Sequence, residues 1–130
     1  MATRSNIIFA DNGKPFVNIY RHWDGYPTCA GVEICEFLQS KTVVDGIGAD
    51  KVYVANGAGC LAAWFLANFK KEAGNYYIEP LTFNSHQDNA FGYVVDVRQG
   101  GTQVSVWEGE TLLFKGNVEK CLEFCQTHEG

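Results

Sequence analysis

The sequence predicts a single α+β domain over residues 1–130, with a mainly antiparallel sheet of about five or six strands and three helices packed largely on one face. Three observations support this fold class. An Asn-Gly turn joins two β-rich runs near the N-terminus, tight turns separate three β-rich runs in the second half, and three other segments show helical periodicity. Strands that follow one another through tight turns favour antiparallel pairing.

The N-terminal hairpin is predicted by residues 6–10 and 16–20, which flank Asp11-Asn12-Gly13-Lys14. Asn-Gly is the strongest short hairpin signal, because both residues accept positive φ. Alternation along the second strand puts Val17 and Ile19 on one face, and we expect this pair to face the core. Three further side chains, at the strand's end and just beyond it, are then expected to emerge together: Tyr20, Arg21 and His22.

Three helices are expected. Thr28 is placed to cap the first, over residues 29–40. The second, over residues 59–73, has the strongest 3.6-residue apolar period in the chain and is followed by Gly74 as a stop signal. Asn117 is placed to cap the third, whose apolar face consists of Val118, Cys121, Leu122 and Cys125.

The remaining segments are assigned by turn residues and β-propensity. Residues 42–50 are expected to form a loop, and residues 52–54 fit either a short strand or the approach to a helix. A strand is expected over 76–81, followed by a polar loop over 82–89. A C-terminal meander is expected over 91–98, 102–107 and 111–115.

Composition narrows the functional class. A net charge of −5 argues against a general binder of DNA or RNA polymers, which would carry a basic face. The N-terminus has too few apolar residues for a signal peptide, and no apolar run approaches the roughly 20 residues that span a bilayer. We therefore expect a cytoplasmic protein without membrane contact.

The five cysteines are odd in number and form no C-x-x-C pair. Cys121 and Cys125 lie four residues apart on an apolar helical face, where a free thiol behaves as a small hydrophobic side chain. We expect reduced core thiols, with no metal site and no cofactor.

The run Tyr20-Arg21-His22-Trp23-Asp24-Gly25-Tyr26-Pro27 concentrates polar and aromatic chemistry in eight residues. Together with the later Asn56-Gly57-Ala58-Gly59-Cys60-Leu61-Ala62-Ala63, it resembles small, poorly characterised proteins of bacteria and their phages that share a Y-x-H-x-D-G-Y-P motif. The likeness covers roughly the first half of the chain. It implies a bacterial or phage origin and no particular activity.

The octet also suits a small-ligand site. Arg21 offers a planar fork of donors for phosphate or carboxylate, and Trp23 and Tyr26 offer faces on which a base could stack. Asp24 could accept from a base edge or a ribose hydroxyl, and His22 adds an imidazole. The alternative is a structural loop in which the same groups bond within the chain and plug the end of the sheet.

Asn56 and Gly57 open the second helix, where free amides and the helix dipole could hold a phosphate. Close helix packing explains this small-residue run equally well, and the spacing does not fit a dinucleotide-binding fingerprint.

A catalytic alternative comes from two H-x-D patterns. If the loops holding them meet, two imidazoles and two carboxylates could bind a divalent metal or act as a general acid–base pair: His22, Asp24, His86 and Asp88. Cys29 with His22 or His86 is a further nucleophile–base pairing. Surface histidines in polar loops are the alternative reading.

These observations favour a small-ligand binding protein over an enzyme. The expected ligand is a small polar or nucleotide-like molecule, and a phage protein would sequester a defence signal in the host cytoplasm. The alternatives are a phosphoester hydrolase and a protein-binding inhibitor of a host enzyme. A homo-oligomer is slightly favoured, since pairing would hide the sheet edges.

Overall fold

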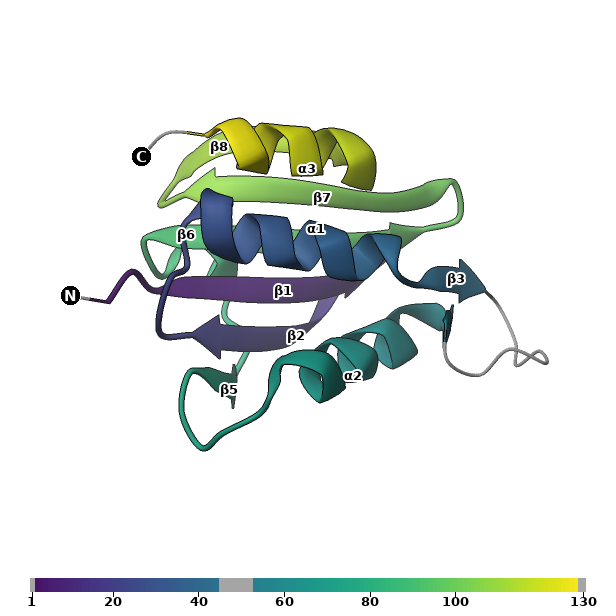
Figure 1. Ribbon diagram of the computed structural model, residues 1–130, viewed down its shortest axis with the longest axis horizontal. Helices are drawn as coiled ribbons and strands as arrows, with labels where there is room; N and C mark the ends of the chain where they lie inside the picture. The colour runs from purple at the N-terminus through teal and green to yellow at the C-terminus, as the bar shows by residue number, and fades with distance from the viewer. Residues whose placement is uncertain (1, 45–52, 129–130) are drawn as a thin grey trace.

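A six-stranded sheet in the order β5-β2-β1-β6-β7-β8 forms the frame of the molecule (Figure 1). The computed structural model describes residues 2–44 and 53–128. The strands of this sheet are β1 (Ser5–Asp11), β2 (Lys14–Arg21), β5 (Tyr76–Glu79), β6 (Phe91–Arg98), β7 (Gly101–Glu108) and β8 (Thr111–Asn117). The predicted α+β class, the N-terminal hairpin and the C-terminal meander are confirmed.

The hairpin and the meander join through one parallel pair, β1 with β6, at the centre of the sheet. All other pairs in this sheet are antiparallel. At the hairpin turn, Asn12 and Gly13 have φ of 48° and 84°, as an Asn-Gly turn requires. Asp96 of β6 accepts from the Gly13 amide at 2.9 Å and from Arg98 at 2.7 Å, so β6 also holds the hairpin turn.

Three helices cover one face of the sheet: α1 (Val32–Gln39), α2 (Gly57–Phe69) and α3 (Val118–Thr127) (Figure 1). Against them the sheet presents aligned rows of apolar side chains. One row consists of Val17, Phe9, Val95 and Val104, and the next consists of Ile19, Ile7, Tyr93 and Val106. Burying a side chain of this size stabilises the fold by roughly 1.5–3 kcal/mol, so these rows anchor the core.

The opposite face of the sheet is covered in part by residues 80–90, which include a short 3-10 turn, Ser85–Gln87. The backbone carbonyl of His86 lies so close to Gly92 that a β-carbon there would fall 1.8 Å from its oxygen. Beneath this segment Asn6 donates to Asn18 at 3.0 Å, and Asn18 donates to the Pro80 carbonyl at 3.0 Å. The expected polar loop is therefore a packed covering layer.

Several element assignments need correction. Residues 42–44, expected in a loop, form β3 (Thr42–Val44), which pairs in parallel with β4 (Val54–Asn56). The first helix begins with a π-helical turn, Pro27–Gly31, and Thr28 does not cap it. The second helix ends at Phe69, four residues before the predicted end. Lys70 is the C-cap, its backbone amide donates to the Leu66 carbonyl, and its ammonium donates to the Tyr76 carbonyl at 2.7 Å.

The third helix follows the prediction: the Asn117 side chain accepts from the Lys120 amide at 2.8 Å. The rest of the loop predicted for residues 42–50, and Val52 of the undecided segment 52–54, lie outside the described residues. Among the helices of the described residues, none is long and apolar enough to cross a bilayer.

Candidate functional site

Arg21 points into the protein, so the expectation that it emerges at the end of β2 is wrong. Strand β2 continues through Arg21, and the alternation that turns Val17 and Ile19 toward the helices turns Arg21 inward as well. Its partner across β1 is Ser5, and beyond that lies Phe91 of β6. Only 5% of Arg21 is exposed.

The Arg21 guanidinium is satisfied within the chain. Nε donates to the Trp23 carbonyl at 2.6 Å, and Nη1 donates to Glu33 at 2.9 Å and to the Tyr76 hydroxyl at 2.9 Å. Nη2 lies 3.5 Å from the Cys29 sulfur. Burial lowers the pKa of Arg21, but the Glu33 hydrogen bond, together with the charges of Tyr76, Glu33 and Cys29, outweighs burial and leaves the pKa above its usual value. The cation joins four segments of the chain.

The rest of the octet divides between surface and interior. Trp23 is 46% exposed and Asp24 is exposed, whereas Gly25 is buried and accepts from the Tyr93 hydroxyl at 2.7 Å. His22 is half-buried, with Nδ1 2.8 Å from the Tyr20 hydroxyl. Arg21 and Gly25 therefore fit the alternative of a structural loop, because both form hydrogen bonds within the chain. The aromatic surface of the octet is still open to a partner.

Tyr26 and Asp24, both predicted to contact a ligand, lie next to each other. The Tyr26 hydroxyl is 3.5 Å from the Asp24 carboxylate. The Asp24 charge, with burial second, raises the pKa of Tyr26. Tyr26 is half-buried, so one part of its ring is already used in packing against the core. The two residues form a small polar rim beside Trp23.

The two H-x-D patterns do not combine into one site. His22 packs on Trp23 beside β2, with ring centroids 5.0 Å apart, whereas His86 packs on Trp107 of β7 at 4.5 Å. Strands β1 and β6 lie between β2 and β7, so β2 and β7 are about 14 Å apart at the usual spacing of about 4.8 Å between neighbouring strands. Within residues 2–44 and 53–128, no three of these His and Asp side chains converge on a metal-sized site.

Cys29 is not arranged as a nucleophile. Its sulfur lies 3.5 Å from Arg21 Nη2 and 3.7 Å from Glu33 Oε2. Burial and then the Glu33 charge raise the pKa of Cys29, with Arg21 opposing them. A thiol held in its protonated form is a weak nucleophile, and neither contact is a histidine base.

Asn56 and Gly57 stand at the start of α2, as predicted, although the Asn56 side chain does not cap the helix. Two adjoining grooves lie beside this helix. A groove of about 300 Å³ is lined by Asp11, Lys14, Pro15, Phe16, Ala58 and Gly59. A groove of about 440 Å³ continues between α2 and the ends of β2 and β5, where Ala62, Leu66, Ile78 and Leu81 contribute to its walls.

Exposed apolar side chains gather around β5. Among the described residues, eight large apolar side chains are exposed, and six of these lie on β5 or on segments next to it. We name these six the β5 belt: Phe16, Trp23, Tyr77, Ile78, Leu81 and Phe83. Ile78 is 71% exposed and Phe83 is 96% exposed. A concentration of this kind is typical of interaction surfaces.

The belt surrounds β5 on both faces. Phe16, Ile78 and Leu81 line one groove on the side of α2, whereas Tyr77, the neighbour of Ile78 in β5, points to the opposite face and lies beside Tyr20. At the other end of β5, Trp23 and Tyr77 both lie beside Gly74. A β-carbon on Gly74 would be within 4 Å of both side chains. Sequence reasoning assigned Trp23 to a ligand pocket and missed the belt, although the apolar residues after Gly74 could have indicated it.

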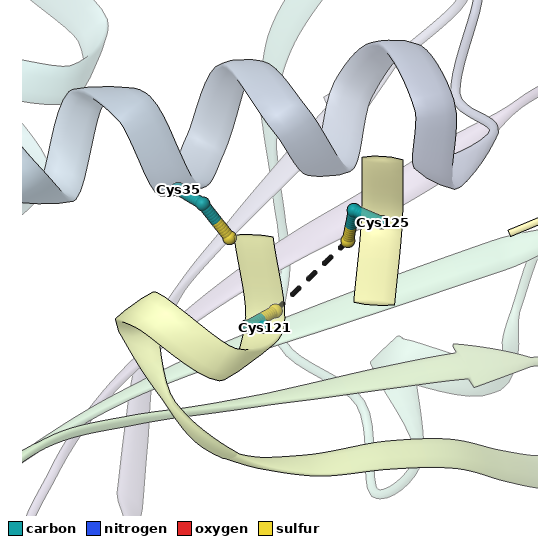
Figure 2. A group of neighbouring side chains, drawn as sticks. All are labelled: Cys35, Cys121 and Cys125. Carbon is teal, nitrogen blue, oxygen red and sulfur yellow. Dashed lines mark hydrogen bonds between the residues drawn. The ribbon is translucent and has the colours of Figure 1, made fainter. Parts of the chain in front are cut away.

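Potential metal ligands do converge in the interior. Cys35 of α1 and Cys121 and Cys125 of α3 place their sulfur atoms within 4.8 Å of one another, and all three are fully buried (Figure 2). The expectation of core thiols agrees with this burial. The meeting of Cys35 with the other two depends on how α1 packs against α3.

No family model matches the chain, and comparisons with curated proteins and with solved structures give no match either.

Proposed function

We propose that this chain is a non-enzymatic binding protein that holds an extended apolar segment of a partner protein along the β5 belt. One observation carries the proposal: six exposed apolar side chains surround a strand whose outer edge has no neighbour in the described sheet. A soluble domain that exposes so many large side chains in one place gains stability when a partner covers them.

The backbone of β5 supports strand addition. Asn75 accepts from the His22 amide at 2.9 Å, and the antiparallel register pairs Tyr77 with Tyr20 and Ile78 with Ile19. Because such ladders alternate, the N–H and C=O of Ile78 point away from β2. An incoming strand can bond to these groups while its side chains meet the belt, which is the recognition mode of β-augmentation.

The side chains of the belt are of the kind that contribute most to protein interfaces. Trp23 and Tyr77 are half-exposed aromatic residues, and Tyr and Trp are enriched among interface residues that dominate binding energy. Ile78 and Phe83 add aliphatic and aromatic surface, each worth roughly 1.5–3 kcal/mol if fully buried. The groove beside α2 then receives side chains that point toward the helical layer.

The motif in Tyr20–Pro27 supports a more specific form of the proposal. If the chain is phage-encoded, as that resemblance implies, the partner is a host protein in the host cytoplasm, and the bound segment belongs to an enzyme that the phage inhibits. A second copy of the chain is the competing occupant, because two β5 edges can pair with each other.

A small ligand in the two grooves is the second candidate function. Their volumes, about 300 and 440 Å³, fall in the range of small-molecule sites. Lys14 supplies a cation close to the first turn of α2, and Phe16 supplies an aromatic face. A nucleotide-derived signal would place its phosphate near Lys14 and its base on Phe16. In this candidate, the nucleotide would bind beside α2 and not at Arg21, where the sequence predicts it.

Extended peptides selected from a random library test the main proposal. We expect selected peptides to bind the wild type and to lose affinity at least about tenfold for Ile78→Pro, which removes the outward N–H without touching the ladder to β2. The matched control is Leu112→Ser, because Leu112 is 46% exposed on β8 at the opposite edge of the sheet. Unchanged binding by Ile78→Pro overturns strand addition.

The same variants separate the remaining occupants. Self-association that is lost in Ile78→Pro and kept in Leu112→Ser identifies the partner as a second copy. Native mass spectrometry of the purified protein tests the small-ligand candidate. A retained ligand that Lys14→Glu releases, with peptide binding unaffected, assigns the grooves to that ligand.

A further inference from the structure

We propose that Cys35, Cys121 and Cys125 form a buried site for a thiophilic d10 metal ion, Zn²⁺ or Cu⁺, between α1 and α3. This inference is independent of the β5 belt and goes beyond the proposed binding function. Figure 2 shows Cys35 descending from α1 toward the two cysteines of α3. The Cys121 and Cys125 sulfur atoms are 4.0 Å apart, and all three lie within 4.8 Å of one another.

The spacing of the sulfur atoms matches metal coordination. For a triangle with edges between 4.0 and 4.8 Å, the centre lies about 2.3–2.8 Å from each corner, and metal–thiolate bonds are about 2.3 Å long. Small rotations of the side chains would bring all three sulfur atoms to bonding distance. A disulfide instead needs sulfur atoms about 2.0 Å apart and leaves one thiol unused.

The fold brings these residues together in two ways. Cys121 and Cys125 are one helical turn apart, so they face the same neighbour, which is the side of α1 that holds Cys35. Gly31, the last residue of the π-helical turn, leaves room for Cys125, because a β-carbon there would lie 2.5 Å from the Cys125 sulfur. A π-helical turn is uncommon and often marks a functional position.

The three sulfur donors determine which metal ions the site would select. Soft thiolate ligands select Zn²⁺ or Cu⁺ from the common biological metals, and each thiol passes its proton to solvent on binding. Among the described His, Cys, Asp and Glu residues, only the three thiols lie together, which is sufficient for three-coordinate Cu⁺. Tetrahedral Zn²⁺ needs a fourth donor, and His128, three residues beyond Cys125, is the nearest histidine in the sequence.

A metal here would act as a cross-link. Cys35 belongs to the helix that receives the Arg21–Glu33 ion pair, whereas Cys121 and Cys125 belong to the C-terminal helix. Metal–thiolate bonds would therefore join α1 to α3 within the helical layer. Because the sulfur atoms are fully buried, we expect loading to occur during folding.

The test is to refold the full chain with one equivalent of Zn²⁺ or, under anaerobic reducing conditions, of Cu⁺, and to measure bound metal after exhaustive dialysis. We expect about one ion per chain, a higher melting temperature than the metal-free protein, and protection of three thiols from alkylation. Replacement of any ligand, as in Cys125→Ala, should lower metal affinity at least about tenfold. Cys60→Ala is the matched control, since Cys60 lies on α2 outside the cluster.

Measuring the melting temperature of each variant in the metal-free state shows whether it folds. A folded Cys35→Ala or Cys125→Ala chain that binds as much metal as the wild type overturns the proposal, as does a wild type that binds neither ion. His128→Ala tests the fourth donor: loss of Zn²⁺ binding with Cu⁺ binding kept assigns His128 as a Zn²⁺ ligand, and unchanged binding of both ions leaves the three thiolates as the protein's whole contribution.

Discussion

The Arg21 guanidinium donates from Nη1 to the Glu33 carboxylate across 2.9 Å, which ties the last residue of β2 to the first turn of α1. The same nitrogen donates to the Tyr76 hydroxyl on β5, and Nε donates to the Trp23 carbonyl. One buried cation therefore sets the positions of the β5 edge and of the loop that carries Trp23. The β5 belt is organised by an interaction that lies beneath it.

Replacement of Arg21 should destabilise the fold. In Arg21→Ala the Tyr76 hydroxyl and the Trp23 carbonyl lose their donor, and we expect the free energy of unfolding in urea to fall by about 2–4 kcal/mol. Glu33→Gln is the control. It keeps an acceptor but removes the counter-charge of the buried guanidinium, and because Glu33 itself is 37% exposed we expect a smaller loss than for Arg21→Ala. If Arg21→Ala is as stable as the wild type, the hydrogen bonds of Arg21 do not hold these segments together.

Gly92 should not tolerate a side chain. A β-carbon there would lie 1.8 Å from the His86 carbonyl oxygen, which is backbone and cannot rotate away. We expect Gly92→Ala to cost about 1–3 kcal/mol and to displace residues 80–90, with a change in Trp107 fluorescence as its contact with His86 is lost. Gly59→Ala has open space around its β-carbon and should be neutral or stabilising.

Stability should depend on pH through His86. Burial lowers the pKa of His86, and the nearby Asp88 opposes this only in part. The unfolded chain therefore binds a proton at His86 more readily than the folded chain does, and the folded state loses stability as the pH falls below about 6.5. We expect the melting temperature to fall more between pH 7.5 and about 5 in the wild type than in His86→Gln. Equal slopes for the two proteins would contradict this assignment.

Asn18 should stabilise the covering segment on the second face of the sheet. It accepts from Asn6 and donates to the Pro80 carbonyl, each at 3.0 Å, and both Asn side chains are buried. Asn18→Ala leaves the buried Asn6 amide without its acceptor and removes the link to the Pro80 carbonyl, so we expect a loss of about 1–3 kcal/mol in chemical denaturation. Asn12→Gly is the control: Asn12 is exposed in a positive-φ turn, and little change is expected.

Local rules predicted most of the fold because its signals lie close together in the chain. The Asn12-Gly13 turn, the Asn117 cap and the period of α2 each depend on contacts within a few residues. The parallel pairing of β1 with β6 joins segments about 80 residues apart, and no short-range pattern encodes it. β3 was missed because a three-residue strand with one partner has almost no periodic signal.

The site was predicted less well, for a reason that Arg21 illustrates. A guanidinium at the end of a strand is normally expected in solvent, and composition alone favours that placement. Strand alternation points the other way, because residues 17, 19 and 21 share a face. Whether the strand continues to residue 21 depends on its pairing with Ser5 and Tyr76, which is a tertiary property.

By itself, the sequence determined the fold class, the hairpin, the meander and the concentration of polar and aromatic groups in residues 20–27. Only the tertiary structure decided that Arg21 is buried, that six apolar side chains surround an open strand edge, and that three cysteines from two helices meet. Turns, caps and amphipathic periods are local interactions, whereas burial and the convergence of distant side chains depend on which elements pack together.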